Sequence, residues 1–196
     1  MTDPSALSAG GQPPATVAIR SIRPDDASGL RALHARLSDE TIRNRFFGPH
    51  RFLPEDEVRR FTSPVAGRDV ALVATVADDI VGVGRSIRLA GRDLAEAAFV
   101  VEDDYQGRGI GTALLTLLAH IAWDAGIRRF VADTFVTNQA MLGVFLHTPR
   151  AVAVTATRRD GAVVHLVMSL VPPGASLALA SDQRTPAPKK LAGSDR

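Results

Sequence analysis

A glycine-rich loop is the part of the sequence whose residue types most clearly suggest chemistry. The segment VVEDDYQGRGIGT, from Val100 to Thr112, places Gly107, Gly109 and Gly111 where an apolar strand gives way to a helix. Glycines let successive amides point the same way, and a helix N-terminus adds free N–H groups and partial positive charge. Such a loop suits an anion of the size of pyrophosphate. The alternative is a loop that only makes a tight strand-to-helix turn.

Arg108 adds a fixed positive charge to this loop. Two other phosphate-binding motifs fit it less well. The dinucleotide fingerprint is disfavoured, because Thr112 stands where a third, later-spaced glycine would fall and a hairpin precedes the motif. A P-loop is excluded, because no Gly-Lys-Ser/Thr follows the glycines.

A single carboxylate interrupts the apolar strand before the loop. Glu96 lies in the run LAEAAFVV and, by strand alternation, shares a face with Ala98 and Val100. Burying a carboxylate is costly unless it is paired or used in chemistry. Two interpretations are therefore open: an ion pair with Arg85 or Arg88 beside an opening in the sheet, or a general base.

Other kinds of catalytic group are scarce. The chain has no cysteine, which excludes disulfides, thiolate zinc sites and a cysteine nucleophile, so acyl transfer would be direct or use another nucleophile. The histidines, at positions 34, 50, 120, 147 and 165, show no metal-ligand spacing, and no metal is expected. His120 fits a structural role inside a helix, and His147 is a secondary acid–base candidate.

Composition limits the partners. The 196 residues suffice for one domain with a hydrophobic core. The net charge is only +2, which does not suggest the concentrated basic face of a nucleic-acid binder. The longest apolar stretch, around Ala113–Trp123, is too short to span a bilayer, and no signal-peptide pattern opens the chain. We therefore expect a cytoplasmic protein without membrane or nucleic-acid partners.

The elements that would position these residues alternate between strand-like and helix-like patterns. Residues 1–15 and 172–196 are rich in small residues and proline and are predicted to be a disordered arm and tail around one domain, 16–171. The predicted strands are Thr16–Ile22, Val70–Ala77, Ile80–Leu89, Arg92–Val101, Arg129–Phe135, Ala151–Thr157 and Ala162–Leu170. The predicted helices are one capped by Asp25 that runs to about Leu37, a short one with Pro54 in its first turn, Gly109–Ala125 with Gly126 beyond its end, and Asn138–His147.

Hairpins on either side of a strand–helix–strand unit imply a mixed sheet with helices on its faces, an α/β fold of the mixed α+β kind.

The loop resembles a known signature. The sequence Gln106-Gly107-Arg108-Gly109-Ile110-Gly111 is similar to the Gln/Arg-x-x-Gly-x-Gly/Ala motif of the GNAT N-acetyltransferases, and the order of elements is similar from Val17 to about Leu170. The resemblance implies a GNAT domain with a mostly antiparallel sheet of about seven strands, splayed at the centre, and about four helices. It also implies that acetyl-CoA, the acyl-donor cosubstrate, lies between the splayed strands. The implied cofactor-binding residues are Phe99, Val100, Val101, Gln106, Gly107, Arg108, Gly109, Ile110, Gly111, Thr112, Asn138 and Phe145. Asn138 also fits a simple helix N-cap.

The resemblance extends to the chemistry. The Ala-Glu-x-x-Phe pattern around Glu96 is similar to that of protein-lysine acetyltransferases, in which the glutamate is the general base. It implies direct transfer in a ternary complex, with the N–H of Val100 as oxyanion donor. Many relatives carry a tyrosine as general acid, but the matching position is Phe145, and Tyr105 lies in the loop. We therefore expect no tyrosine acid. A thiol with a pKa of about 8.5 is a tolerable leaving group without one.

The acceptor is less well specified. The stretch from Arg43 to Pro49 resembles a segment of bacterial protein-lysine acetyltransferase domains, although Phe46 and Phe47 also fit plain core anchors. We expect a protein lysine as acceptor. One alternative is a small-molecule amine N-acetyltransferase, which an acidic pocket near Arg43–Glu57 would favour, with Glu55, Asp56 and Glu57 as its carboxylates. Another is a non-catalytic acyl-CoA-binding regulatory domain. The preferred acyl length and the oligomeric state stay open.

Overall fold

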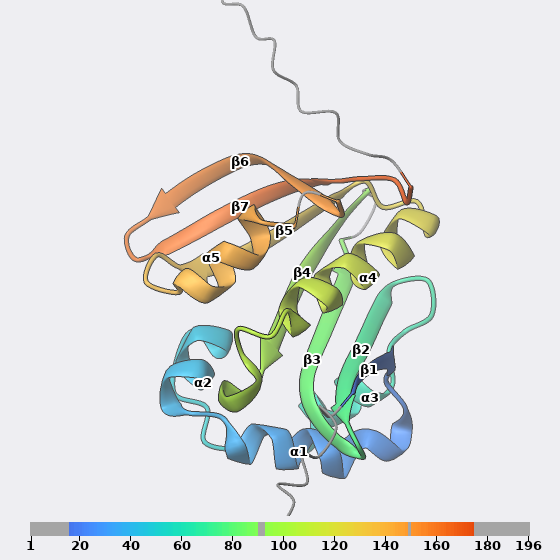
Figure 1. Cartoon of the computed structure of the whole chain (residues 1–196), viewed down its shortest axis with the longest axis vertical. Coiled ribbons are helices and arrows are strands. Elements are labelled where there is room, and N and C mark those ends of the chain that lie inside the picture. The colour runs from blue at the N-terminus through green and yellow to red at the C-terminus, as the bar shows by residue number, and fades with distance from the viewer. Residues whose placement is uncertain (1–15, 90–92, 149, 175–196) are drawn as a thin grey trace, which may run out of the picture.

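The computed structural model describes residues 16–89, 93–148 and 150–174. The predicted arm 1–15 and most of the predicted tail lie outside these residues. The described strands are β1 (Val17–Ser21), β2 (Asp69–Val76), β3 (Asp79–Arg88), β4 (Leu94–Val101), β5 (Arg129–Phe135), β6 (Val152–Asp160) and β7 (Val163–Leu170). The described α-helices are α1 (Ala27–Arg36), α2 (Asp39–Phe46), α3 (Glu55–Thr62), α4 (Ile110–Asp124) and α5 (Gln139–Leu146), as Figure 1 shows.

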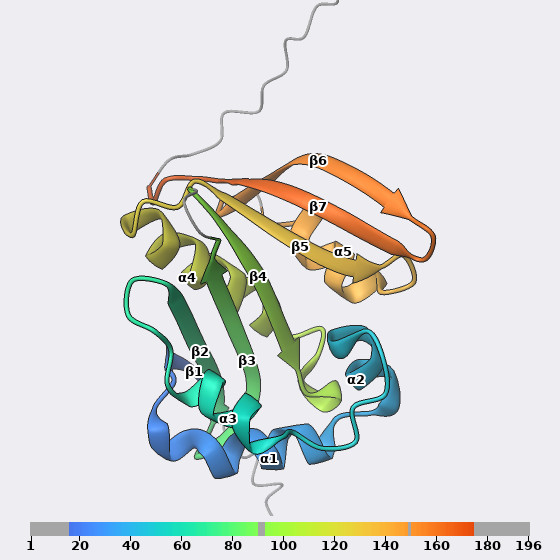
Figure 2. The same ribbon diagram turned by 180° about the vertical axis from the view of Figure 1, so that it is seen from behind.

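The strands form one sheet that opens at its centre. Its order is β1-β2-β3-β4-β5-β7-β6, and every neighbouring pair is antiparallel except β4 and β5. These two pair in parallel only from Leu94 to Glu96, opposite Arg129 to Val131, and diverge beyond that point (Figures 1 and 2). The predicted mixed, mostly antiparallel and splayed sheet is thus confirmed.

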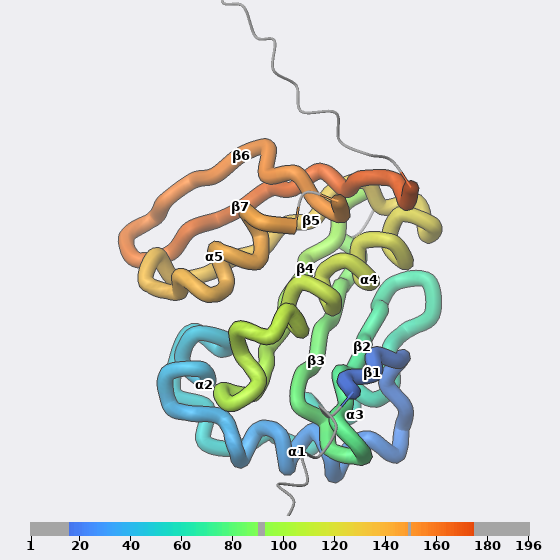
Figure 3. The backbone as a smooth tube through the Cα atoms, in the orientation of Figure 1, coloured from blue at the N-terminus to red at the C-terminus, as the bar shows by residue number. Residues whose placement is uncertain are grey.

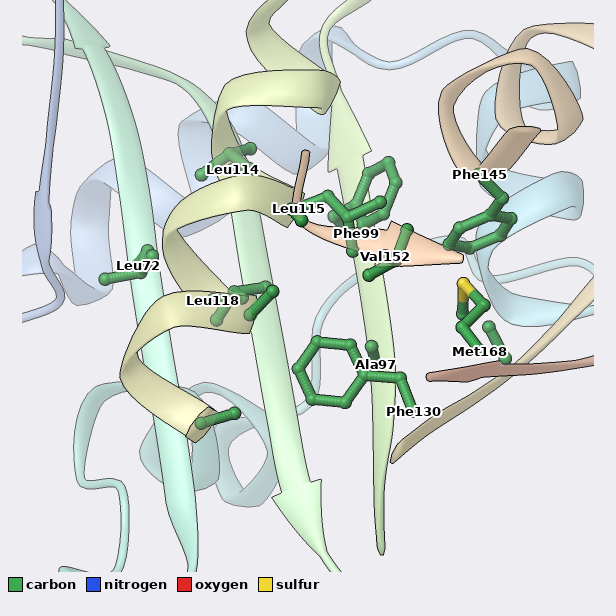
Figure 4. Packing of buried hydrophobic residues seen from close by; sticks show 14 of the residues in the cluster. Leu72, Ala97, Phe99, Leu114, Leu115, Leu118, Phe130, Phe145, Val152 and Met168 are labelled. Atoms are coloured by element: carbon green, nitrogen blue, oxygen red, sulfur yellow. The ribbon is translucent and has the colours of Figure 1, made fainter. Parts of the chain in front are cut away.

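Helix α4 covers one face of the sheet and builds the larger core. Its buried side chains Leu114, Leu115 and Leu118 pack toward Leu72 and Phe130, as Figure 4 shows. Truncating a leucine buried in this way costs about 2–5 kcal/mol. Helices α1 and α3 cover the other face with a second core. The two cores fix the strand ends around the central opening.

The structure corrects the predicted start of the first helix. Asp25 does not cap it: the helix begins at Ala27, and Asp26 is its N-cap residue, although the Asp26 side chain makes no capping hydrogen bond to the helix. The Asp26 carboxylate accepts a hydrogen bond from Arg23 N at 2.6 Å and pairs with Arg20 at 2.7 and 2.8 Å. The adjacent acids could not be told apart by sequence, because only the fold places Arg20 beside one of them.

Helix α2 was not predicted. None of its residues is fully buried, so it lacks the apolar stripe on which a periodicity argument depends. Its local signals are nevertheless clear. The Ser38 hydroxyl caps it by accepting a hydrogen bond from Thr41 N at 3.2 Å, and its C-cap is Phe47, whose φ is 59°. Figure 3 shows α2 next to the loop that precedes α4, across the opening from α5.

Candidate active site

A cleft of about 390 Å³ occupies the place where β4 and β5 separate. The glycine loop and the start of α4 form one side, β4 a second, and helices α2 and α5 the others. Its lining residues are Thr41, Asn44, Arg45, Phe99, Val100, Val101, Tyr105, Gln106, Gly107, Gly109, Ile110, Gly111, Thr112, Asn138, Ala140, Met141, Gly143 and Val144.

The start of α4 presents free backbone amides to this cleft. Gly107 and Gly109 have φ values of 72° and 82°, which favour glycine, and a Cβ at either position would meet nothing within 4 Å. Gly109 is the N-cap and supplies no side chain to the helix. Within the described residues, nothing accepts a hydrogen bond from the amides between Gly107 and Thr112. The loop is therefore open to an anion and is not capped by the protein itself.

Polar contacts from α1 and α2 hold the loop in place. Arg36 donates from Nε and Nη2 to the two carboxylate oxygens of Glu102, at 2.9 Å each. Asp103 accepts from Ser38 N at 2.9 Å, Ser38 Oγ at 2.6 Å and Thr41 Oγ1 at 2.7 Å. Burial acts to raise the pKa of the Asp103 carboxyl, but these hydrogen bonds outweigh it, and the pKa lies below its usual value. The loop is thus fixed before any ligand arrives.

Gln106 and Arg108 point in different directions. Gln106 Nε2 donates to Val101 O at 3.1 Å and to Thr41 Oγ1 at 3.3 Å, so it joins the end of β4 to α2 beside the cleft. The Arg108 guanidinium is exposed and lies 5.1 Å from the centre of the Tyr105 ring. Arg108 does not line the cleft, and its charge acts from the rim.

Asn138 and Phe145, the two residues of the α5 region predicted to bind the cofactor, line different clefts. Asn138 Oδ1 accepts from Met141 N at 3.1 Å, so Asn138 is the N-cap of α5 as well as a lining residue of the cleft. Phe145 is buried, and its ring meets Phe99 edge-on, with the centres 5.6 Å apart. Phe145 lines a second, adjoining cleft instead of the first.

The second cleft, about 350 Å³, continues from the first toward the other half of the sheet. Glu96 lines it and is exposed there. Of the two interpretations of Glu96, the ion pair with Arg85 or Arg88 is wrong: Arg85 pairs with Asp69 at 3.1 Å, and Arg88 donates to a backbone oxygen at Ala125. The lining residues are Asn44, Arg45, Phe46, Phe47, Glu96, Ala97, Ala98, Phe99, Asp133, Thr134, Met141 and Phe145.

Arg45 lies at the junction and lines both clefts. Burial lowers the pKa of its guanidinium below the usual value, and the carboxylates of Glu57 and Glu96 oppose that shift. On the far wall, Asp133 contacts His165 at 2.7 Å. The second cleft therefore has two carboxylates, those of Glu96 and Asp133, and one arginine. This balance favours a cationic ligand.

The backbone of β4 presents alternate residues to the opening. Glu102 N donates to Val81 O at 2.9 Å, and the register continues without a bulge to the pair Val83–Val100. Hydrogen-bonded pairs alternate along an antiparallel ladder, so Val83–Val100 is also of that type. The N–H of Val100 is thus directed at β3, while that of Phe99 is directed at the opening. This direction argues against Val100 as the oxyanion donor.

The model of the acetyltransferase (GNAT) family matches residues 36–147. The chain belongs to this family. The match runs from the end of α1 to the end of α5 and so includes the glycine loop, Glu96 and both clefts. The predicted resemblance of the chain to GNAT N-acetyltransferases is confirmed. The prediction that the chain is an acetyltransferase is confirmed as well.

Individual relatives agree. The crystal structure of the GNAT domain of S. lividans PAT is 35% identical, with a TM-score of 0.72 over 79% of this chain and 90% of that one. Acetyltransferase Pat of Mycolicibacterium smegmatis is 50% identical over 48 residues, which are 24% of this chain and only 14% of Pat. An acetyltransferase of Pseudomonas aeruginosa is 29% identical over 129 residues, 64% of this chain and 69% of that protein.

Sequence reasoning missed several residues of this GNAT site. Thr41 and Arg45 belong to α2, the helix without an apolar stripe, and Ser38 is its N-cap. The signal that could have found it is a serine N-cap followed by Asp39 and Glu40 in the first turn. Thr134, on β5, carried no signal in the sequence.

Proposed function

We propose that this chain transfers an acetyl group from acetyl-CoA directly to the amine of a protein lysine, in a ternary complex with Glu96 as general base. The observation that carries the proposal is the run of free amides at the start of α4, beside a cleft that leads to Glu96. The transfer can be direct, because a neutral amine attacks a thioester once a general base has taken up its proton.

The residues present fit acetyl-CoA. The amides from Gly107 to Thr112, at the positive end of α4, suit the pyrophosphate, and Arg108 adds attraction from the rim. Gln106 contributes by holding the loop to β4. The pantetheine arm would pair with backbone that β4 presents to the opening at Phe99 and Val101, and Val100 would contribute its side chain. The Asn138 amide nitrogen is a donor on the α5 side of the cleft, and Phe145 supplies an apolar boundary near the thioester.

Proton removal is the main demand on the catalytic residues. A lysine with a pKa of about 10.4 needs about 4.6 kcal/mol to lose its proton at pH 7, at about 1.36 kcal/mol per pKa unit. A carboxylate at the second cleft can accept that proton directly or through water as the amine attacks. An N–H aimed at the developing oxyanion is typically worth about 2.7–4 kcal/mol. The direction of the β4 backbone favours Phe99 N–H over Val100 N–H for this role.

The charge of the second cleft supports an amine acceptor, whether a protein lysine or a small amine. The small-amine alternative expects an acidic pocket near Arg43–Glu57, with Glu55, Asp56 and Glu57 as its carboxylates. Those side chains instead pair with Arg31, Arg60 and His50, and they line neither cleft. The likeness to the S. lividans PAT domain and the exposed Phe47 at the second cleft support a protein acceptor. The cytoplasmic location of this chain stays a prediction.

A non-catalytic role is less well supported. Glu96 is a carboxylate at the cleft, and no arginine, lysine or histidine of the described residues pairs with it. A chain that only bound acyl-CoA would have no use for such a group.

The test is calorimetric titration with CoA. We expect one CoA per chain, and Gly109→Ala to weaken binding at least about tenfold, because its Cβ enters the anion site and its φ becomes strained. Gly67→Ala is a matched control. Gly67 also has a positive φ, 77°, and equally open surroundings, but it lies between α3 and β2 and lines neither cleft. Unchanged affinity in both Gly109→Ala and Arg108→Ala would count decisively against the pyrophosphate assignment.

The acceptor needs a separate experiment. A proteome extract and a panel of small amines are incubated with acetyl-CoA and the chain, and new acetyl groups are located by mass spectrometry. Acetylated protein lysines support the proposal, and acetylation of small amines alone supports the alternative.

A further inference from the structure

A buried hydroxyl in β5 has no partner. Thr134 is 1% exposed, and in the described part of the chain only two buried side-chain nitrogen or oxygen atoms lack a hydrogen bond, Thr134 Oγ1 and Arg85 Nε. Arg85 is otherwise engaged, since its guanidinium binds Asp69. Leaving a buried donor unsatisfied costs free energy, and such groups in native structures call for an explanation.

The position of Thr134 suggests one. By strand alternation it points to the same face of the sheet as Phe130 and Ala132, the face covered by α4 and α5. It lines the second cleft together with Phe99 and Phe145, whose rings lie side by side in Figure 4. Phe99 also lines the first cleft, so it lies at the boundary between the two, and Thr134 shares the second cleft with it.

This boundary is where the thioester must lie if the proposed function is right. The pyrophosphate would occupy the start of α4, and the acceptor amine would approach past Glu96 in the second cleft. Between them the walls combine the apolar side chains of Phe99, Met141 and Phe145 with Asn44 and Arg45, which line both clefts. A hydrogen-bond donor in such surroundings acts more strongly than it would in water.

We propose that the Thr134 hydroxyl donates a hydrogen bond to the CoA sulfur while the C–S bond breaks. It would thereby stabilise the leaving thiolate at a site where Phe145 cannot, because a phenylalanine has no proton to offer. The inference rests on the proposed function, since it needs acetyl-CoA in the cleft.

The reaction balances without any further reactant. The lysine ammonium first loses one proton to the Glu96 carboxylate, which passes it to solvent. The nitrogen of the neutral amine then forms a bond to the thioester carbonyl carbon, and the second proton that it loses passes to Glu96. The C–S bond then breaks, and its electron pair stays on sulfur. The Thr134 hydroxyl keeps its own proton and shares it with the thiolate through the hydrogen bond. Solvent takes the proton from Glu96 and protonates the thiolate after release.

The test compares the binding of CoA and desulfo-CoA, which lacks the sulfur, by calorimetry at about pH 9, where the free thiol is largely ionised. We expect the unmodified chain to prefer CoA by about tenfold, the size of one hydrogen bond to a charged group. Thr134→Val, nearly identical in shape, should bind desulfo-CoA normally and lose that preference. Thr134→Ser should keep it. Thr134→Val should also melt no lower than the unmodified chain, because a methyl replaces an unpartnered hydroxyl.

Thr62→Val is the matched control. Thr62 is also buried, but its hydroxyl donates to Val58 O at 3.1 Å within α3, away from both clefts. Thr62→Val should lower the melting temperature of the chain and leave its preference for CoA over desulfo-CoA unchanged. The inference is overturned if Thr134→Val keeps the full preference, or if it weakens both ligands equally, as a purely structural role predicts. If the unmodified chain binds neither ligand, the proposed function itself fails.

Discussion

Glu102 accepts two hydrogen bonds from the guanidinium of Arg36, each 2.9 Å long. Glu102 is buried just after β4, and Arg36 is the last residue of α1. The hydrogen bonds that Arg36 donates to Glu102 raise the pKa of Arg36 above its usual value. Arg36 Nη2 also donates to Ile80 O at 2.8 Å. This contact therefore connects the first helix to the sheet and to the loop that presents the free amides.

Arg36→Met should lower the free energy of unfolding by about 2 kcal/mol, because it leaves the Glu102 carboxylate buried without its charged donor. It should also weaken CoA binding, since the loop loses a fixed contact. Urea unfolding and calorimetry measure the two effects. Arg31→Met is the control, because it removes a more exposed ion pair with Glu55, for which a loss under about 1 kcal/mol is expected. Equal losses in the two variants would contradict the assigned role.

Glu96→Gln should lower kcat by about 100-fold or more and leave CoA affinity unchanged, because it removes the proton acceptor but no cofactor contact. The residual rate should rise with pH as more of the acceptor amine is already neutral. Steady-state kinetics over a range of pH, together with calorimetry, check this. Asp133→Asn removes a charge from the same cleft and should reduce kcat much less. Full activity of Glu96→Gln at neutral pH would rule out Glu96 as the base.

Asp69 should make the fold sensitive to acid. The hydrogen bond from Arg68 lowers the pKa of the Asp69 carboxyl below 3.8, burial opposes this, and a further hydrogen bond from Arg85 adds to it. The unfolded chain therefore takes up a proton first as the pH falls. The stabilisation is present above about pH 4 and is lost as the pH drops through the folded-state pKa.

Asp69→Asn should cost about 3 kcal/mol at pH 7, because it leaves Arg85 largely buried without its partner. It should also flatten the dependence of stability on pH below about pH 4. Urea unfolding between about pH 3 and pH 7 measures both. A variant with the same acid dependence as the unmodified chain would show that other carboxyls cause it.

His34 should make the folded chain less stable at mildly acidic pH. Burial lowers the pKa of His34, the adjacent His50 lowers it further, and Glu57 opposes the shift. The unfolded chain, with a histidine pKa of about 6.5, binds the proton more readily. Stability should then decrease as the pH falls below about 6.5 and level off below the folded-state pKa. Thermal unfolding at about pH 7.5 and pH 5.5 tests this, and His34→Asn should show a smaller difference than the unmodified chain.

The sequence alone determined the order of most elements, the mixed sheet and the family. These depend on local physics. Strand and helix periodicities are visible in runs such as that of Leu114–Leu118, and glycines are needed where φ is positive, as at Gly107 and Gly109. The motif before α4 could therefore be read directly as the start of an anion site.

The tertiary structure decided what depends on contacts between distant residues. Helix α2 has no fully buried residue. Its position depends on the hydrogen bonds that Ser38, its N-cap, and Thr41 donate to Asp103 in the loop. The direction of the Val100 N–H follows from the register of β3 and β4, which no local pattern specifies. Thr134 becomes noteworthy only because the fold buries its hydroxyl without a partner and places the residue in the wall of the same cleft as Phe99 and Phe145.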